Sequence, residues 1–132
     1  MNQVVARFLD GTTLKGDTAD FLPAKSTFHI TPFGPPDEVK PLEVQVSDLK
    51  ALYFVRSLVG NSRHKEADAF LTDSPVPGRK IQVTFRDGEV MLGTTQGYQP
   101  GRPGFFLVPA DPASNNERCF IVTASAKAID FV

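Results

Sequence analysis

Apolar and polar residues alternate in short runs along most of this chain. The run through Val4, Ala6 and Phe8 alternates in this way, as does the run through Ile81 and Val83. A period of two residues is typical of a strand with one buried face. Each run is followed by Asp-Gly, which indicates a tight hairpin, and we expect a type I′ turn with positive φ at both central residues. The pattern therefore predicts β-hairpins and a mainly β protein.

The second half of the chain repeats the first. An offset of 77 positions aligns residues 1–55 with 78–132 without a gap, and thirteen aligned positions are identical. Average residue usage would give about three identities. The identical pairs are Phe8/Phe85, Asp10/Asp87, Gly11/Gly88, Gly16/Gly93, Thr18/Thr95, Pro23/Pro100, Phe28/Phe105, Pro32/Pro109, Pro35/Pro112, Lys50/Lys127, Ala51/Ala128, Phe54/Phe131 and Val55/Val132. We therefore predict an internal duplication, with repeats at 1–55 and 78–132.

Each repeat is predicted to hold five short strands. After the first strand of the first repeat, the residues expected to face inward are Leu14, Gly16, Thr18, Phe28, Ile30, Leu42, Val44, Val46, Leu52 and Phe54. The glycine inside the second strand indicates a sharp bend. Five short strands with a bent second one are typical of an SH3-like or Sm-like small barrel. Because 55 residues bury little core, we expect the two barrels to pack on each other.

The linker at 56–77 carries a different pattern. Ser62 is a candidate helix cap, and a short helix is expected to run to about Leu71. The following Asp-Ser-Pro-Val-Pro-Gly, residues 73–78, predicts a stiff exit loop.

Composition changes the picture only by exclusion. The net charge is −1, and residues 1–55 hold five Lys or Arg against seven Asp or Glu. Nucleic-acid affinity depends mostly on basic residues that release phosphate counterions, so nucleic acid is an unlikely partner. No apolar stretch is long enough to span a bilayer, so membrane insertion is not expected. A single cysteine cannot form an internal disulfide, which fits a reducing cytoplasm.

Candidate chemistry is sparse, and we expect neither an enzyme nor a cofactor. The two histidines, His29 and His64, lack the Cys/His/Asp spacing of a zinc site and are expected at the surface. Cys119 aligns with an inward position and is expected to be a buried hydrophobe. Asp10 and Asp87 are explained by their turns.

Two loops offer candidate binding residues. A cation recurs before the third strand of both repeats, at Lys25 and Arg102. The loop at 109–118 is rich in side-chain donors and acceptors, and its candidates are Asp111, Asn115, Asn116 and Arg118. Binding residues often sit on loops held by rigid strands. A solvated loop tip is nevertheless the favoured explanation of the first loop, and a plain Asx turn explains the second loop equally well.

The motif F-x-D-G-x-x-x-x-G-x-T followed by an aromatic residue, from Phe8 to Phe21 and from Phe85 to Tyr98, resembles the first half of the Sm/LSm/Hfq motif. That resemblance implies a bent five-stranded barrel, RNA binding and ring assembly by strand pairing. The chain departs from the motif at two positions. Where an Asp is expected it has Leu22 and Gln99, and where an Asn is expected a few residues later it has Ser26 and Pro103. No RNA contact is carried over.

The segments VARFLDGTTLKGDTADFLPAKSTFHITP, LKALYFVRSLVGN and GFFLVPADPASNNER are similar to an uncharacterised bacterial domain found alone or appended to PilZ and response-regulator proteins. That resemblance implies a signalling context. The PilZ signature for cyclic-di-GMP, R-x-x-x-R with a later [D/N]-x-S-x-x-G, is absent from the sequence.

The sequence favours a non-catalytic regulatory or adaptor module that binds a protein partner in bacterial signal transduction through barrel edges or loops. One alternative is a sensor for a nucleotide second messenger, such as a cyclic dinucleotide, with Lys25, Arg102 and Arg118 against phosphates. Another is an Sm-like RNA-binding protein. The oligomeric state is left open between monomer and homodimer.

Overall fold

A computed structural model describes residues 2–33, 39–57, 78–111 and 114–132. The prediction of a mainly β protein is confirmed, because nearly all regular structure in these ranges is strand. The first five strands are β1 (Asn2–Phe8), β2 (Thr13–Thr18), β3 (Thr27–Pro32), β4 (Leu42–Gln45) and β5 (Leu49–Val55). The others are β6 (Arg79–Phe85), β7 (Val90–Thr95), β8 (Gly104–Pro109), β9 (Asn116–Val122) and β10 (Ala126–Phe131). Two 3₁₀ turns, η1 (Val46–Asp48) and η2 (Thr123–Ser125), precede β5 and β10.

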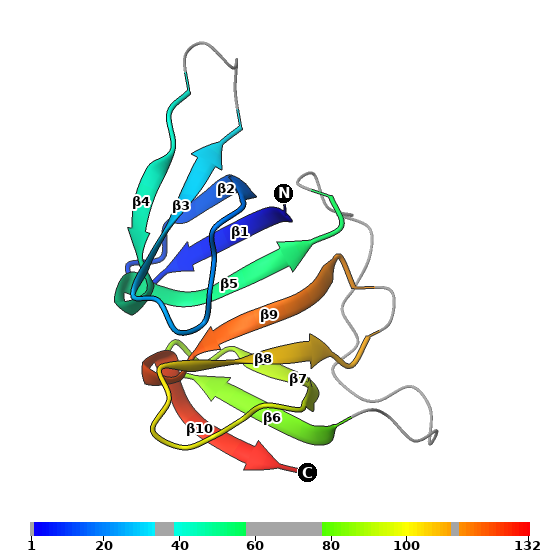
Figure 1. Ribbon diagram of the computed structural model, residues 1–132. Helices are drawn as coiled ribbons and strands as arrows, with labels where there is room; N and C mark the ends of the chain where they lie inside the picture. The colour runs from blue at the N-terminus through cyan, green and yellow to red at the C-terminus, as the bar shows by residue number, and fades with distance from the viewer. Residues whose placement is uncertain (1, 34–38, 58–77, 112–113) are drawn as a thin grey trace.

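All ten strands belong to one antiparallel sheet. Its order is β10-β6-β7-β8-β9-β5-β1-β2-β3-β4, so β5 and β9 are neighbours although they are far apart in sequence. Figure 1 shows these two strands side by side across the middle of the molecule, with β1–β4 beyond β5 and with β6–β8 and β10 beyond β9. We call the β5–β9 junction the seam. The two strands at the ends of the order, β4 and β10, are the sheet edges.

The elements of the two halves recur at the offset found in the sequence. The bounds of β6, β7, β8 and η2 are those of β1, β2, β3 and η1 displaced by 77 residues. Within each half the strand order is also the same, since β5-β1-β2-β3-β4 corresponds to β10-β6-β7-β8-β9. Corresponding residues can therefore be compared one by one.

The hairpin turns differ from the predicted type. Gly11 and Gly88 have φ of 90° and 94°, but no residue other than glycine has positive φ in the described ranges, so a type I′ turn is wrong. The amide of Gly11 donates to the Phe8 carbonyl, and the amide of Phe8 donates to the Thr12 carbonyl. This is a longer hairpin loop in which only the glycine takes the left-handed conformation.

The strand glycines allow a close approach between backbones. A Cβ at Gly16 would lie 2.1 Å from the Thr31 carbonyl oxygen, and one at Gly93 would lie 2.2 Å from that of Val108. Any side chain at either position would collide with the neighbouring strand, β3 or β8. The glycines thus let β2 and β7 pack tightly where they meet that strand.

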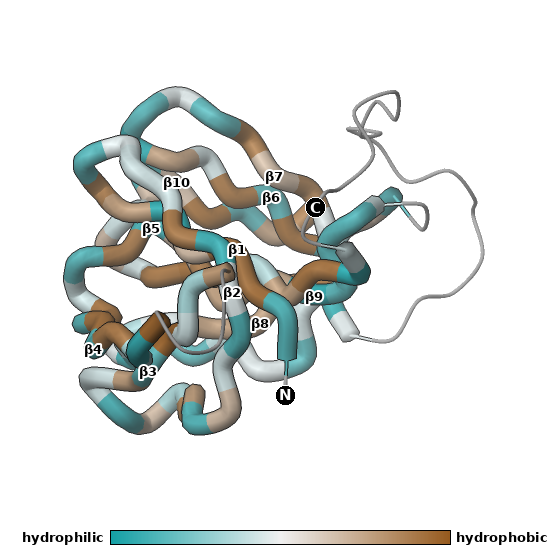
Figure 2. The backbone as a smooth tube through the Cα atoms, turned by 90° about the horizontal axis from the view of Figure 1, so that it is seen from above, coloured by the Kyte–Doolittle hydropathy of each residue, from teal (hydrophilic) through white to brown (hydrophobic). Residues whose placement is uncertain are grey.

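Two hydrophobic cores share the seam strands. Leu52 and Phe54 of β5 pack in the core of the first half, whereas Ala51 and Tyr53 pack in the core of the second. On β9, which belongs to the second half, Phe120 packs in the core of the first half. Both strands are therefore covered on both faces. In Figure 2 hydrophobic residues gather along the strands, and hydrophilic residues mark most of the connecting loops.

Most positions predicted to face inward are buried, but two predictions at the sheet edges are wrong. Leu42 is 48% exposed and Phe131 is 38% exposed, because β4 and β10 each have a neighbour on one side only. His64 and the helix predicted from Ser62 to Leu71 lie outside the described residues.

Candidate functional site

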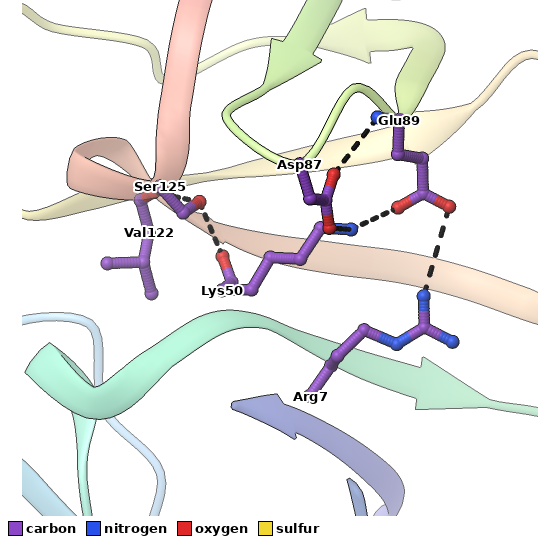
Figure 3. Close-up of polar contacts among 6 residues, drawn as sticks. All are labelled: Arg7, Lys50, Asp87, Glu89, Val122 and Ser125. Carbon is purple, nitrogen blue, oxygen red and sulfur yellow. Dashed lines mark hydrogen bonds and ion pairs between the residues drawn. The ribbon is translucent and has the colours of Figure 1, made fainter. Parts of the chain in front are cut away.

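A buried lysine, Lys50, links the two halves at one end of the seam. Lys50 stands at a β-bulge, since the register of β5 on β1 passes from Ala51 to Leu49. Its side chain is only 6% exposed, and its Nζ donates to Asp87 Oδ2 at 2.7 Å and to Glu89 Oε1 at 2.6 Å (Figure 3). A bulge redirects a side chain. Here it directs the ammonium of one half onto the hairpin of the other.

Neighbouring groups complete this contact. Ser125 Oγ donates to the Lys50 carbonyl at 2.8 Å, and the Lys50 ammonium lies 4.4 Å from the centroid of the Phe85 ring. The hydrogen bond from Lys50 holds the pKa of Asp87 below its usual range. Burial raises the pKa of the nearby Tyr53 hydroxyl, so that this group stays neutral. The arrangement satisfies a buried charge, and we read it as structural.

An aromatic cluster covers one face of the seam. The Phe21 ring, from the β2–β3 connection, lies 5.7 Å from Phe54 and 5.0 Å from Phe120, measured between centroids. The Arg118 guanidinium lies 4.5 Å from the Phe54 centroid and 4.7 Å from that of Phe106. The predicted ligand residue Arg118 thus rests on the rings of Phe54 in β5 and Phe106 in β8.

The loop at 109–118 is tied to the end of β5. Asn115 accepts from the Ser57 amide at 3.2 Å and donates to the Ser57 carbonyl at 2.9 Å, while Arg56 Nε donates to the Ser114 carbonyl at 3.1 Å. Asp111 is buried, and Asn116 begins β9. Ser114 and Asn115 of this predicted ligand loop thus extend the pairing between the two halves.

Lys25 and Arg102 lie elsewhere. Each is an exposed residue whose amide closes a turn, to Leu22 in the β2–β3 connection and to Gln99 in the β7–β8 connection. Lys25 and Arg102 come just before the starts of β3 and β8, whereas the β8–β9 loop follows the end of β8 (Figure 1). The structure therefore does not bring all the candidate binding residues into one site.

His29 has a close partner in Asp20. Its Nδ1 lies 2.7 Å from Asp20 Oδ2, and its backbone amide donates to Asp20 Oδ1 at 2.9 Å. The backbone hydrogen bond is the main reason that the pKa of Asp20 is lowered. The pair borders a shallow hollow with Thr31 and Lys40. Across the described ranges, no three His, Cys, Asp or Glu side chains are grouped to hold a metal ion.

The aromatic rings at the outer edge of β10 are spaced like the rings at the edge of β5 that pairs with β9. The Tyr98–Phe105 and Tyr98–Phe131 centroid distances are 5.0 and 5.6 Å, against 5.0 and 5.7 Å for Phe21–Phe28 and Phe21–Phe54. At the seam, Phe120 and Arg118 of β9 continue this cluster. Beyond β10 no described strand follows.

Backbone groups on β10 also face outward. The Val132 amide donates to the Lys80 carbonyl of β6. Because amides alternate along an antiparallel strand, those of Ala128 and Asp130 face β6, and those of Ile129 and Phe131 face away from it. Within the described residues, the edge thus combines backbone donors that have no partner strand with partly exposed apolar side chains, and it is the candidate site.

In the part of the chain that the structure describes, fold and edge together define a mainly β protein built on one antiparallel sheet, with β10 as an edge strand. The chain belongs to the family of unknown function DUF6982, whose model matches residues 1–132. No curated protein and no solved structure matches it. Among the described residues, no helix has the length and apolar character to cross a membrane.

Sequence reasoning missed this edge as a particular site, although it named barrel edges in general. The available signal lay in the difference between aligned strands. Leu52 and Tyr53 align with Ile129 and Asp130, so β5, whose residues are all buried, has a counterpart with a carboxylate in place of an aromatic residue. Such a contrast distinguishes a central strand from an edge strand.

Proposed function

We propose that this protein is a non-catalytic adaptor that binds a protein partner by adding a strand of the partner to the outer edge of β10. Strand addition gives affinity through main-chain hydrogen bonds and selectivity through alternate side chains. The bacterial signalling context and the cytoplasmic location remain part of this proposal. The first rests on the sequence resemblance and the second on the single cysteine.

The observation that carries the proposal is the equivalence of β10 and β5. Each is the fifth strand of its half, follows a 3₁₀ turn and pairs with the first strand of that half. The outer side of β5 receives β9, and the ring geometry around Phe54 is reproduced around Phe131. This supports β10 as an edge already shaped for a further antiparallel strand.

The other edge is less suited to accept a strand. β4 has only four residues, and Lys40, Pro41 and Glu43 lie in or beside it. A short edge with proline and charge is a recognised protection against strand pairing. The contrast favours β10 as the binding edge.

We also propose that the chain arose by duplication of one small barrel-like unit. The 77-residue offset of the strand bounds and the matched aromatic distances support this origin. On this view, the seam is an association between two units that became internal, and β10 keeps the surface that β5 uses at the seam.

A peptide-display selection against the folded protein tests the adaptor function. We expect the selected peptides to lose binding to Phe131→Pro, which removes an outward N–H, and to keep most of it with Phe131→Ala, which retains that N–H. The matched change at the other edge, Glu43→Pro, should leave binding intact. Peptides that bind Phe131→Pro and the unmodified protein equally would refute strand addition at β10.

A further inference from the structure

The seam also indicates what the added strand should look like. We propose that the β10 edge selects an extended partner segment in which a basic residue is followed by an aromatic one. The basic residue lies opposite Asp130 and the aromatic residue opposite Ile129. This inference rests on the proposed function and specifies its partner.

The aromatic position follows from the register of β9 on β5. Phe120 lies opposite Leu52, and its ring centroid is 5.0 Å from that of Phe21. Leu52 corresponds to Ile129, and Phe21 corresponds to Tyr98. A residue opposite Ile129 on an added strand would therefore face the Tyr98 ring. An aromatic side chain there would gain an edge-to-face contact in addition to the area that it buries.

The basic position follows from the one strong chemical difference between the two fifth strands. Tyr53, opposite Cys119 at the seam, packs in the second core, whereas its counterpart Asp130 is exposed and acidic. Opposite charges on directly facing residues stabilise a strand pair. A partner residue at this position should therefore be Lys or Arg.

The position opposite Phe131 makes no similar demand for a cation. At the seam Arg118 covers the Phe54 ring, but Arg79 of β6 already lies 3.6 Å from the centroid of the Phe131 ring. The chain thus supplies at its own edge the cation that the neighbouring strand supplies at the seam. A β-branched residue is sufficient at this position of the partner.

A second copy of this chain that docked through β4 would be a poor occupant. If β4 of another copy took the place that β9 has at the seam, Glu43 would face Ile129, Leu42 would face Asp130 and Pro41 would face Phe131. An acid would stand where an aromatic residue fits, an apolar residue where a cation fits, and proline would remove a donor. The edge therefore favours a segment of a different protein over β4 of a second copy.

Labelled decapeptides test this inference by fluorescence anisotropy with the full chain. The probe has the sequence of residues 114–123 with Arg118→Thr and Cys119→Lys. Adding Phe120→Ala to the probe should weaken binding about tenfold. A Glu in place of the new Lys should weaken binding about threefold, and Asp130→Lys in the protein should reverse that preference.

The possible outcomes separate the two proposals. Loss of binding with Phe131→Pro, together with the aromatic and charge effects, supports both. Loss with Phe131→Pro but indifference to both peptide changes overturns the motif and leaves strand addition standing. Binding that Phe131→Pro does not alter overturns both, as does light scattering that shows a dimer abolished by changes at β4 and β10.

Discussion

At the scale of single residues, the residues that are identical in the two aligned halves are required for different structural reasons. Gly16 and Gly93 are required by a neighbouring carbonyl oxygen, and Gly11 and Gly88 by positive φ. Lys50 and Lys127 are identical in sequence but not in surroundings, since one is buried at the seam and the other is exposed at the edge. Residue identity therefore indicates shared backbone geometry more reliably than shared environment.

The strand glycines give the first prediction. Gly93→Ala should destabilise the protein by about 3 kcal/mol, because the added Cβ forces the backbones of β7 and β8 apart. Gly97→Ala is the matched control, since nothing lies within 4 Å of a Cβ at that position. Urea denaturation measures both variants, and equal midpoints would contradict the close approach.

The ion pairs of Lys50 give a pH prediction. Because the pKa of Asp87 is lowered in the folded state, its contribution to stability is present above its unfolded-state pKa and is lost as the pH falls through the folded pKa. Lys50→Met should therefore reduce the loss of stability between neutral pH and about pH 2.5, an interval that spans the ordinary Asp pKa of about 3.9.

The control for this prediction is Lys127→Met, which changes the exposed counterpart on β10. Urea midpoints at the two pH values should show the same acid-induced decrease for this variant as for the unmodified protein. If Lys50→Met also kept the full decrease, the pairing across the seam would not hold the pKa of Asp87.

At the scale of elements, the sequence predicts the strands better than it predicts their neighbours. Alternation and Asp-Gly turns place β1, β2, β6 and β7 closely. The sequence does not show that β5 pairs with β9, because this pairing depends on contacts between distant segments. The unbroken apolar run Cys-Phe-Ile-Val at 119–122, like the one in β5, was the available sign of a strand covered on both faces.

The shared strands give an element-scale prediction. Phe120 is 1% exposed on β9, yet its ring belongs to the core of the first half. Phe120→Ala should cost about 3–5 kcal/mol, as for a large aromatic residue removed from a core. Phe33→Ala, at a position that is 82% exposed, should be nearly neutral. A small effect of Phe120→Ala on chemical denaturation would mean that β9 does not complete the first core.

At the scale of the whole molecule, the sheet is continuous through the seam and ends at two unlike edges. The candidate binding residues predicted from sequence divide accordingly, with Asn115 and Arg118 holding the halves together and Lys25 and Arg102 on exposed turns. The loops looked functional because polar residues that stabilise a junction have the composition of polar residues that bind a ligand. Only the pairing of β5 with β9 separates the two roles.

Amide hydrogen exchange by NMR tests this account most directly, because it reports which side of each fifth strand is paired. In the free protein, the amides of Leu52 and Phe54 should be protected by β9, and those of Ala128 and Asp130 by β6. The amides of Ile129 and Phe131 should exchange rapidly in the free protein. They should become protected when the decapeptide probe with Arg118→Thr and Cys119→Lys is added. Strong protection of Ile129 and Phe131 in the free monomer, or rapid exchange at Leu52 and Phe54, would contradict an open edge at β10 and a closed seam at β5.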